Sequence, residues 1–175
     1  QTSYIWASKN KLDTVYKINK FIEDYGAREL INLSEARINN RLSDLGSRIV
    51  NREEKIRRIC IAGPSSSGKT SFSNRLLFEL MARSLRPVRI SMDNFYIPRG
   101  ELKPGTDIES IDAIDLPFFN SVRNQLIRGE EVTLPVYDFK EGKRKTGKKI
   151  QLDEDQPIII EGIHALNPLS TSSIP

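Results

Sequence analysis

Cysteine and histidine are almost absent from this sequence, which contains one of each, Cys60 and His164. A single cysteine excludes a disulfide framework and a cysteine-rich metal site. Cys60 lies inside an apolar run, where a small buried core residue is the expected interpretation rather than a reactive thiol. For His164 a turn or packing role is favoured over a role in a site.

Long apolar runs are also missing. No stretch of about 18 apolar residues is present, and the N-terminus has no apolar signal core. We therefore expect a soluble, cytoplasmic protein with no membrane segment. The length of 175 residues and the apolar content of 38% suit one domain with a real core. Because Gln1 is not an initiator methionine, the chain is expected to be a piece of a longer protein.

The net charge of +4 comes from one short segment, residues 140–149, which holds six basic residues and one acidic residue. The rest of the chain has 21 basic and 22 acidic residues. This is not the face-wide basic footprint of a nucleic-acid-binding protein. The segment is interpreted either as a solvated hairpin or as a basic flap near phosphates, and nucleic acid is not an expected partner.

Residues 63–70 match G-x-x-x-x-G-K-[ST], a loop whose backbone N–H groups surround nucleotide phosphates. An apolar run precedes the loop and helical spacing follows it, which is the required strand–loop–helix context. Lys69 can reach the β- and γ-phosphates, and Thr70 can ligate Mg²⁺. The alternative is a Ser/Gly turn that happens to carry a lysine. The predicted nucleotide-binding residues are Gly63, Pro64, Ser65, Ser66, Ser67, Gly68, Lys69, Thr70 and Ser71.

The remaining pattern divides the chain at about residue 55. Residues 1–55 are predicted to form a helical segment with no evident chemistry. Gly26 is expected to end the first helix of this segment. Residues 56–175 alternate strands and helices, which predicts an α/β three-layer sandwich with a mainly parallel sheet, as in P-loop NTPases. The expected elements are strands at 56–62, 87–93, 132–139 and 157–161, helices at 70–84 and after Asp115, and a hairpin at 143–152 with its turn at Thr146-Gly147.

Two carboxylates end predicted strands, Asp93 and Glu161. Ligands gather at the carboxyl ends of parallel strands. A carboxylate that closes the all-isoleucine strand is costly unless it is paired or bound to metal, so Glu161 is predicted to share Mg²⁺ with Thr70; a structural salt bridge is the alternative. Asp93 is predicted to accept a hydroxyl proton during phosphoryl transfer, the alternative being a cap for the next turn.

Several motifs occur in an order and spacing that resemble the uridine kinases, which group with phosphoribulokinase and pantothenate kinase. They are the phosphate loop, Ser91–Tyr96, Asp112–Asp115, Leu134–Phe139 and Ile160–Ile163. The resemblance covers residues 56–168. It implies transfer of the γ-phosphoryl group of ATP or GTP, with Mg²⁺, to a nucleoside hydroxyl. It also implies Asp93 and Lys69 as catalytic residues and a substrate pocket formed by Tyr96, Glu109, Tyr137, Phe139 and Arg144.

The sequence departs from that family at two substrate positions. Glu109 replaces an aspartate that holds the ribose hydroxyls, and Gly142 replaces a histidine that helps to recognise the base. Loss of a hydrogen-bond partner for the base changes discrimination strongly, so we expect the acceptor to be a nucleoside or similar small metabolite other than uridine. The variant is more similar to uridine kinase-like proteins with a threonyl-tRNA-synthetase-like N-terminal portion.

The family continues beyond the strand that ends at Glu161 with an arginine-bearing lid, whereas this chain stops at Pro175. We therefore expect the 175-residue piece to bind nucleotide poorly and to turn over little, which a comparison with a longer chain would test. The second hypothesis is an NTP-binding sensor or regulatory module without nucleoside kinase activity. A GTPase switch is disfavoured because its Asp-x-x-Gly and Asn-Lys-x-Asp motifs are missing. The sequence leaves open whether the protein forms an oligomer.

Overall fold

The computed structural model describes residues 2–171, which divide into two compact units, one that ends at Leu45 and one that begins at Gly46. Helices α1 (Thr2–Lys9), α2 (Val15–Tyr25) and most of α3 (Ala27–Val50) make up the first unit. α2 ends at Gly26, as expected: this residue has φ +91° and its N–H bonds the carbonyl of Ile22 at 2.8 Å. The predicted helical character of the N-terminal segment is confirmed, while the domain limit at residue 55 stays a prediction.

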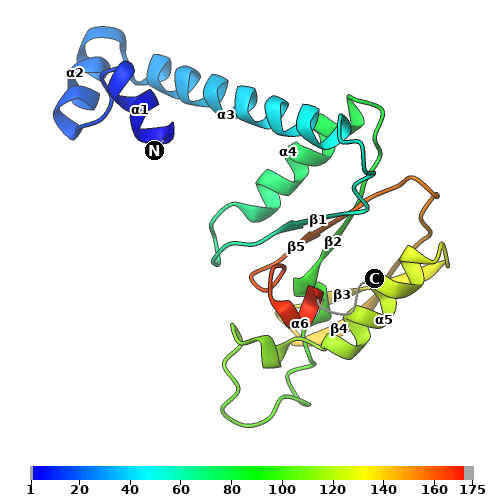
Figure 1. The fold of residues 1–175 in the computed structure, drawn as a ribbon. Coiled ribbons are helices and arrows are strands. Elements are labelled where there is room, and N and C mark those ends of the chain that lie inside the picture. The colour runs from blue at the N-terminus through cyan, green and yellow to red at the C-terminus, as the bar shows by residue number, and fades with distance from the viewer. Residues whose placement is uncertain (1, 172–175) are drawn as a thin grey trace. The chain divides into compact units, whose positions relative to one another are not determined.

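The second unit is an α/β fold around a parallel sheet (Figure 1). Its strands are β1 (Arg58–Ile61), β2 (Val88–Ser91), β3 (Val132–Asp138), β4 (Lys143–Ile150) and β5 (Ile158–Glu161). Its helices are α4 (Lys69–Met81), α5 (Leu116–Ile127) and α6 (Pro168–Thr171), with the short 3-10 turns η1 (Met92–Phe95) and η2 (Ile111–Ala113). β5 lies between β1 and β2 and runs parallel to both, and β3 and β4 form a separate antiparallel pair.

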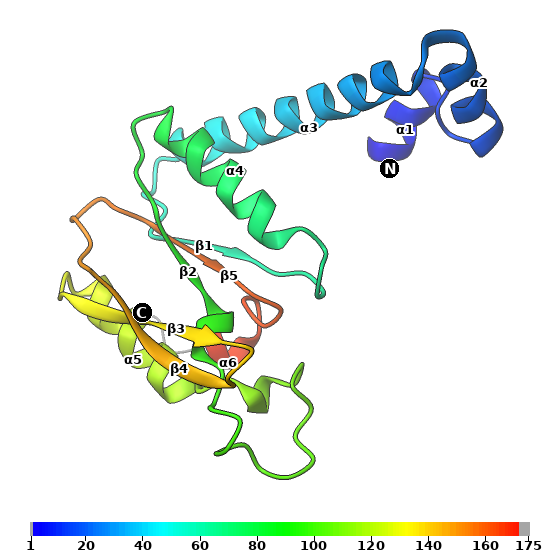
Figure 2. The same ribbon diagram turned by 180° about the vertical axis from the view of Figure 1, so that it is seen from behind.

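Helices cover both faces of the parallel sheet. The chain passes from β1 through α4 to β2, and then returns through α5 to the central strand β5. Crossovers between parallel strands are right-handed, so two crossovers in opposite directions place their helices on opposite faces. Figures 1 and 2 show α4 on one side of the sheet and α5 on the other. The predicted three-layer α/β sandwich is confirmed.

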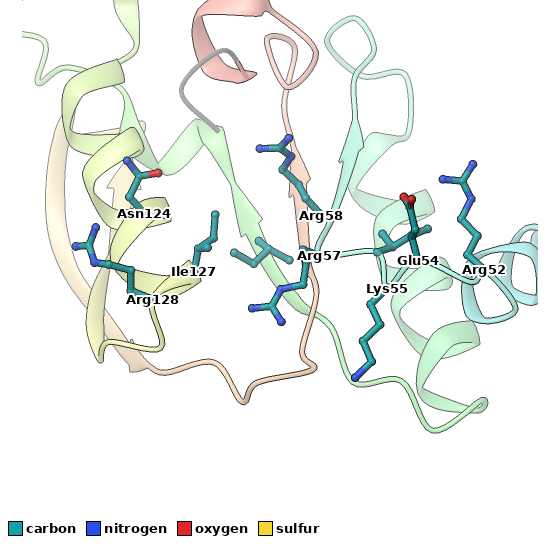
Figure 3. Close-up of a pocket in the computed structure, with 10 residues that line it drawn as sticks. Arg52, Glu54, Lys55, Arg57, Arg58, Asn124, Ile127 and Arg128 are labelled. Atoms are coloured by element: carbon teal, nitrogen blue, oxygen red, sulfur yellow. The ribbon is translucent and has the colours of Figure 1, made fainter. Parts of the chain in front are cut away.

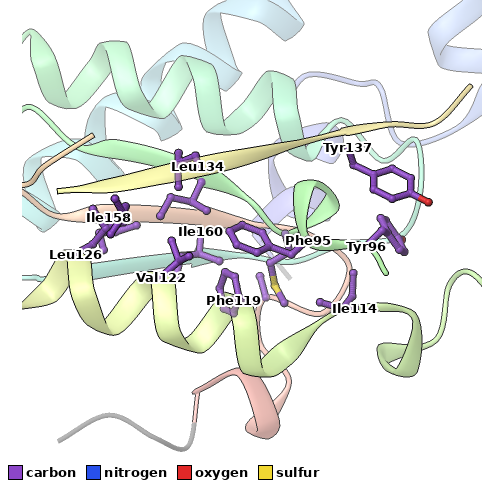
Figure 4. Close-up of a cluster of buried hydrophobic side chains, with 14 of the residues drawn as sticks. Phe95, Tyr96, Ile114, Phe119, Val122, Leu126, Leu134, Tyr137, Ile158 and Ile160 are labelled. Carbon is purple, nitrogen blue, oxygen red and sulfur yellow. The ribbon is translucent and has the colours of Figure 1, made fainter. Parts of the chain in front are cut away.

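The central strand β5 is buried along its whole length, as three consecutive isoleucines predicted. Ile158 and Ile160 belong to the main core, where Phe119, Val122 and Leu126 of α5 pack beside them (Figure 4). Side chains alternate along a strand, so the fully buried Ile159 faces the α4 side. This strand therefore holds Glu161 at a fixed place between the two layers.

β2 ends two residues earlier than predicted, because the chain turns into η1 at Met92. Met92 and Phe95 are each 1% exposed, and the ring of Phe95 contacts Phe119 edge-to-face with centroids 5.1 Å apart. These two anchors bend the chain under the core directly after the strand. As a result Asp93 lies in a tight turn beyond the strand end and not at the last strand position.

The predicted hairpin at 143–152 is wrong. Residues 143–150 form one continuous strand, β4, which pairs with β3, and the actual turn lies between Asp138 and Lys143. Thr146-Gly147 lies inside β4, at a register irregularity opposite Pro135. A Cβ on Gly147 would lie 2.5 Å from the carbonyl oxygen of Leu134, so this glycine allows close backbone approach rather than a turn.

Part of the excess of basic residues in β4 is neutralised by carboxylates of the same unit. Lys145 pairs with Asp138 at 2.7 Å and with Glu141 at 3.0 Å, and Lys149 pairs with Glu131 at 2.8 Å. Hydrogen bonds from Lys145 and from the turn lower the pKa of Asp138. Cross-strand ion pairs of this kind place the basic segment in the β3–β4 hairpin, and the expectation that nucleic acid is not a partner stays a prediction.

Gly162 should not tolerate a side chain. A Cβ there would lie 2.8 Å from the Cβ of Met92, which carries the turn that contains Asp93. We expect Gly162→Ala to lower the free energy of unfolding by about 1–3 kcal/mol, measured by urea denaturation, because overpacking forces the turn to move. Gly100→Ala is the matched control, since nothing lies within 4 Å of its added Cβ. Equal stability of the two variants would contradict this.

Candidate active site

The phosphate loop joins β1 to α4 and has the backbone that its glycines and serines allow. Gly68 has φ +84° and Ser66 has φ +57°, both in the left-handed region. α4 begins at Lys69, and its first backbone bond runs from Phe72 N–H to the carbonyl of Gly68 at 2.9 Å. The loop therefore leads directly into a helix N-terminus, where free N–H groups and the helix dipole favour an anion.

Two features inside the loop fix the position of Lys69. Its ammonium donates to the carbonyl of Pro64 at 2.7 Å. A Cβ on Gly63 would lie 2.8 Å from Ser67 Oγ and 3.3 Å from Lys69 Cγ, so only glycine lets the loop close this tightly. The loop holds the lysine side chain along its own rim, at the start of α4.

The structure brings Thr70 and Glu161 together although 91 residues separate them in the sequence. Thr70 Oγ1 lies 3.4 Å from each carboxylate oxygen of Glu161. Glu161 is 2% exposed, and no ion pair in the described residues engages it. The predicted salt-bridge alternative for Glu161 is therefore not observed within residues 2–171.

Hydroxyl and carboxylate oxygens are the donors that Mg²⁺ prefers, and a buried carboxylate without a cationic partner fits a cation site. Magnesium commonly keeps waters and binds few protein ligands beside substrate phosphates. Thr70 and Glu161 therefore fit a magnesium ion shared with nucleotide phosphates. No cluster of three or more His, Cys, Asp or Glu side chains suited to a metal occurs in the described part of the chain, so the ion would depend on phosphate and water oxygens for its other ligands.

Asp93 lies in η1, close enough to Glu161, Lys69 and His164 for their charges to act on it. Burial is the largest influence and raises the pKa of Asp93, and the negative charge of Glu161 raises it further. Lys69 and His164 act in the opposite direction. The two strand-end carboxylates and the loop lysine thus form one electrostatic group, which sequence separation alone does not reveal.

The three predicted pocket aromatics form one cluster beside Asp93. The ring centroids of Tyr96 and Tyr137 lie 5.5 Å apart, and Phe139 lies 5.6 Å from Tyr96 and 4.9 Å from Tyr137. The two tyrosines are buried, whereas Phe139 is 54% exposed and available to a ligand. Burial and the nearby Asp93 carboxylate raise the pKa of Tyr96 to about 12, so its hydroxyl keeps its proton.

Glu109 lies on the edge of this cluster, with its charge acting on Tyr96. The ring of His164 reaches the Glu109 backbone, with Nε2 2.8 Å from the carbonyl oxygen. A carbonyl only accepts, so Nε2 must carry the proton and donate. His164 itself is held by the Ser170 hydroxyl, which donates to its carbonyl at 2.9 Å.

Arg144 stands directly opposite Tyr137 in the β3–β4 register, and directly opposed residues lie on the same face of the pair. Its guanidinium pairs with Asp115 at 2.9 Å and lies over the ring of Phe118, 5.1 Å from the centroid. Asp115 also caps α5 by accepting from Phe118 N–H. Arg144 therefore has a structural role at the start of α5, and its predicted substrate contact stays a prediction.

Three residues near the site make contacts there that the sequence analysis did not predict, although Asn94 lies within the motif Ser91–Tyr96. Asn94 Oδ1 accepts from Tyr137 N–H at 3.2 Å and so joins η1 to β3. Arg99 lies against Gly142, because a Cβ added to this glycine would lie 2.8 Å from the Cβ of Arg99. The Arg99 guanidinium also donates to the carbonyl of Phe139 at 3.0 Å. His164 is the third. Each acts on a partner that is at least 40 residues away in the sequence, so no local pattern marks it.

Comparison with known proteins now decides the family. A profile described as phosphoribulokinase / uridine kinase family matches residues 58–170. The chain belongs to this family. Uridine-cytidine kinase C of Dictyostelium discoideum is 31% identical over 107 residues, which are 61% of this chain and 23% of that protein. A uridine kinase of Lactobacillus helveticus is 31% identical over 113 residues, covering 62% of this chain and 52% of that protein.

Other comparisons widen this picture. A solved structure described as a possible uridine kinase from Bacillus stearothermophilus superposes with a TM-score of 0.67 at 22% identity, over 78% of this chain and 77% of that one, and so has the same fold. Inorganic pyrophosphatase TTM2 of Arabidopsis thaliana is 32% identical over 107 residues, 61% of this chain and 15% of that protein. The chain thus spans about half the length of the bacterial uridine kinase and smaller shares of the other two relatives.

The membership in a kinase family agrees with the predicted resemblance. The link of residues 1–55 to threonyl-tRNA synthetase stays a prediction, because the family match begins at residue 58. In residues 2–171 no helix combines the length and apolarity that a membrane crossing requires.

We expect His164 to hold residues 98–110 in place. His164→Phe keeps the ring but removes the donor to Glu109, so the amides of this loop should exchange hydrogen about 2- to 13-fold faster, the equivalent of one hydrogen bond. Hydrogen–deuterium exchange followed by mass spectrometry measures this. His164→Gln, which retains a donor, is the matched control and should exchange more slowly than the Phe variant. Unchanged exchange in His164→Phe would show that the contact does not restrain the loop.

Proposed function

We propose that this protein transfers the γ-phosphoryl group of ATP or GTP to a hydroxyl of a nucleoside or similar small metabolite. The observation that carries the proposal is the convergence of Lys69, Asp93 and Glu161 at one end of the sheet, although they come from three separate segments. Family membership supports the same reaction class. Two relatives are named uridine kinase and uridine-cytidine kinase, and the matched segment covers 52% and 23% of their respective lengths.

In the proposed reaction the acceptor hydroxyl attacks the γ-phosphorus. The new bond forms between the acceptor oxygen and phosphorus, while the bond to the bridging β–γ oxygen breaks and the nucleoside diphosphate leaves. Asp93 takes the hydroxyl proton, and its raised pKa brings its basicity closer to the working pH. Lys69 and the loop N–H groups hold the phosphate charge in place. When bound by Thr70 and Glu161, Mg²⁺ would neutralise charge on the phosphate oxygens.

The acceptor would lie against the aromatic cluster of Tyr96, Tyr137 and Phe139. The exposed ring of Phe139 offers a stacking surface for a planar base. Arg99 occupies the space beside Gly142, where the resembled family has a base-recognising histidine. Because a guanidinium donates hydrogen bonds and cannot accept them, we expect the acceptor preference to differ from that of uridine. Glu109 is proposed to contact the acceptor from the loop that His164 holds.

A panel assay tests the proposal. A form of the protein that extends beyond Pro175 is incubated with Mg-ATP or Mg-GTP and one acceptor at a time, including uridine, cytidine, purine nucleosides and small sugar alcohols, and phosphorylated product is detected by mass spectrometry. Phosphorylation of at least one acceptor, abolished by Asp93→Asn, is the expected result. No product with any acceptor, under conditions in which nucleotide is bound, would overturn the kinase proposal.

The second candidate function is an NTP-binding sensor without nucleoside kinase activity. The comparison with inorganic pyrophosphatase TTM2 favours it, because a segment of the same length and similarity occurs in a protein named for another activity. The changes at Glu109 and Gly142 point the same way. In this case nucleotide binding should alter the protein's conformation or stability, and Asp93→Asn should leave that response unchanged.

A further inference from the structure

A pocket of about 630 Å³ lies near the amino-terminal ends of β1 and β5, whose first residues, Arg58 and Ile158, line it (Figure 3). Arg57 in its lining donates to the carbonyl of Glu154, and Nη1 of Arg58 is buried with no hydrogen-bond partner in the described residues. The phosphate loop follows the opposite, carboxyl-terminal end of β1. Because an acceptor hydroxyl must reach the γ-phosphate, its recognition depends on residues at the other end of the sheet from this pocket.

At that end, Arg99 takes the place that a side chain on residue 142 would take. A Cβ added to Gly142 would lie 2.8 Å from Cβ, 3.1 Å from Nε and 3.2 Å from Cζ of Arg99. The backbone N–H of Arg99 donates to the carbonyl of Gly142 at 2.8 Å, and Gly142 has φ +65°. Glycine is therefore required at this position both by the backbone and by the guanidinium that lies against it.

The guanidinium of Arg99 is held beside Phe139, the exposed ring of the aromatic cluster. Its Nη2 donates to the Phe139 carbonyl at 3.0 Å, which fixes the guanidinium against the turn between β3 and β4. A guanidinium carries five N–H donors in one plane. One of them is engaged here, and no ion pair in the described residues involves Arg99. The remaining donors are available to a ligand that lies against Phe139.

The carboxylates of the same turn do not neutralise Arg99. Asp138 and Glu141 both pair with Lys145, at 2.7 Å and 3.0 Å. Arg99 itself is exposed. The turn thus presents a guanidinium with unused donors next to an exposed aromatic ring. A flat ligand rich in hydrogen-bond acceptors suits this pair of groups, because it can stack on the ring and accept from the guanidinium at its edge.

Carboxylates near the same aromatic cluster have the complementary preference. Burial is the largest cause that raises the pKa of Tyr96, and the charges of Asp93, Glu109 and Asp107 raise it further. These carboxylates therefore lie close enough to act on the cluster. A carboxylate accepts hydrogen bonds and so suits the hydroxyl groups of a ligand. The acceptor pocket thus combines groups that bind hydroxyls with a guanidinium that binds acceptor atoms.

We propose that Arg99 selects the phosphoryl acceptor by binding a flat group with two adjacent hydrogen-bond acceptors. This inference rests on the proposed phosphoryl transfer and names its substrate class. A 6-oxopurine base offers O6 and N7, cytosine offers O2 and N3, and a carboxylate offers its two oxygens, and a guanidinium binds such pairs through two parallel hydrogen bonds. Uracil has no such pair, because its N3–H donor separates the two carbonyl groups.

Binding of acceptors in the absence of nucleotide tests this assignment. Isothermal titration uses a form of the protein that extends beyond Pro175 and matched pairs of compounds: inosine with 7-deazainosine, cytidine with 3-deazacytidine, and gluconate with glucitol. The second compound of each pair lacks the paired acceptors. We expect one pair to differ in affinity by at least about fivefold in the wild-type protein, the low end of what a bidentate arginine contact supplies. The pair that differs identifies which of the three groups Arg99 binds.

Two variants with matched controls connect the difference to Arg99. Arg99→Met should abolish it, whereas Arg28→Met, which changes an exposed arginine of α3 in the other unit, should preserve it. Gly142→Ala should reduce the difference, because the added Cβ displaces the Arg99 side chain. Gly129→Ala also places alanine at a positive φ, +77°, but nothing lies within 4 Å of its added Cβ, so this variant should preserve the difference.

The outcomes separate this inference from the proposed reaction. A difference that depends on Arg99, together with no phosphorylated product, would support the assignment of Arg99 and contradict the kinase proposal. Phosphorylation of an acceptor at the same rate in the wild-type protein and in Arg99→Met would support the kinase proposal and overturn the assignment. No binding, equal affinity within every pair, or a difference that persists in Arg99→Met would also overturn it.

Discussion

Replacing Asp93 by asparagine should lower turnover by a factor of about 10²–10⁴ while leaving nucleotide affinity nearly unchanged. Asparagine has the size of aspartate but cannot accept the acceptor's proton at neutral pH. Asp93 is positioned for that task because it lies beside Lys69 and Glu161 without belonging to the phosphate loop. Steady-state kinetics on the best acceptor measure turnover, and a fluorescent ATP analogue measures affinity.

Asp24→Asn is the matched control for this substitution, because it changes an exposed aspartate of α2 in the other unit. It should leave both quantities unaltered. Loss of nucleotide affinity in Asp93→Asn would place this residue in the nucleotide site and contradict the proposed role as base. If Asp93→Asn forms phosphorylated product at the wild-type rate, Asp93 has no role in proton transfer.

The same substitution should raise stability in a pH-dependent way. Burial and Glu161 raise the pKa of Asp93 in the folded protein, so the folded state binds more protons than the unfolded state as pH rises past the ordinary value of 3.8. The ionised carboxylate therefore costs stability above its raised pKa and costs nothing when protonated in both states. Asp93→Asn should gain stability relative to wild type as pH rises, and thermal unfolding at a series of pH values measures the gap. A gap that shrinks with rising pH would contradict the raised pKa.

Replacing Lys69 by methionine should weaken triphosphate binding by a factor of about 10–10², which corresponds to the roughly 1.5–3 kcal/mol of a hydrogen bond to a charged group. Methionine keeps the unbranched stem that packs near Gly63 but removes the ammonium that now bonds to the Pro64 carbonyl. Isothermal titration with ATP and with adenosine measures the loss. The effect should be confined to ATP, because adenosine carries no phosphate.

Lys20→Met is the control for charge, since this exposed lysine of α2 is removed without touching the loop. Its ATP affinity should match that of the wild-type protein. A Lys69→Met variant that binds ATP as tightly as wild type would show that residues 63–70 do not hold the phosphates, and the proposed reaction would lose its basis.

Local sequence patterns predicted the core of this fold well. Three isoleucines before Glu161 indicated a strand buried on both faces, and β5 is buried throughout. Asp115 followed by Pro117 indicated a helix start, and Asp115 caps α5. These predictions succeeded because burial of a strand and capping of a helix depend on residues within one or two turns of each other.

Turn predictions succeeded only where the turn depended on local chemistry. Thr146-Gly147 has turn-forming residues, yet the structure uses this glycine for close approach to Leu134 inside a strand. The pairing of β4 with β3 along its length outweighs the local preference, and cross-strand contacts are invisible in a single segment. The actual turn ends at Gly142, which has φ +65° and packs against Arg99.

The sequence by itself determined the phosphate loop, the alternation of strands and helices, and the position of Asp93 and Glu161 at or just after the ends of strands. Backbone conformation and burial depend largely on neighbouring residues, which is why these features could be predicted. Only the tertiary structure decided that Glu161 meets Thr70, that His164 reaches Glu109, and that the Nη1 atom of Arg58 is buried without an acceptor in the described residues. These contacts join segments far apart in the chain, and parallel strands bring such segments together only once the sheet has formed.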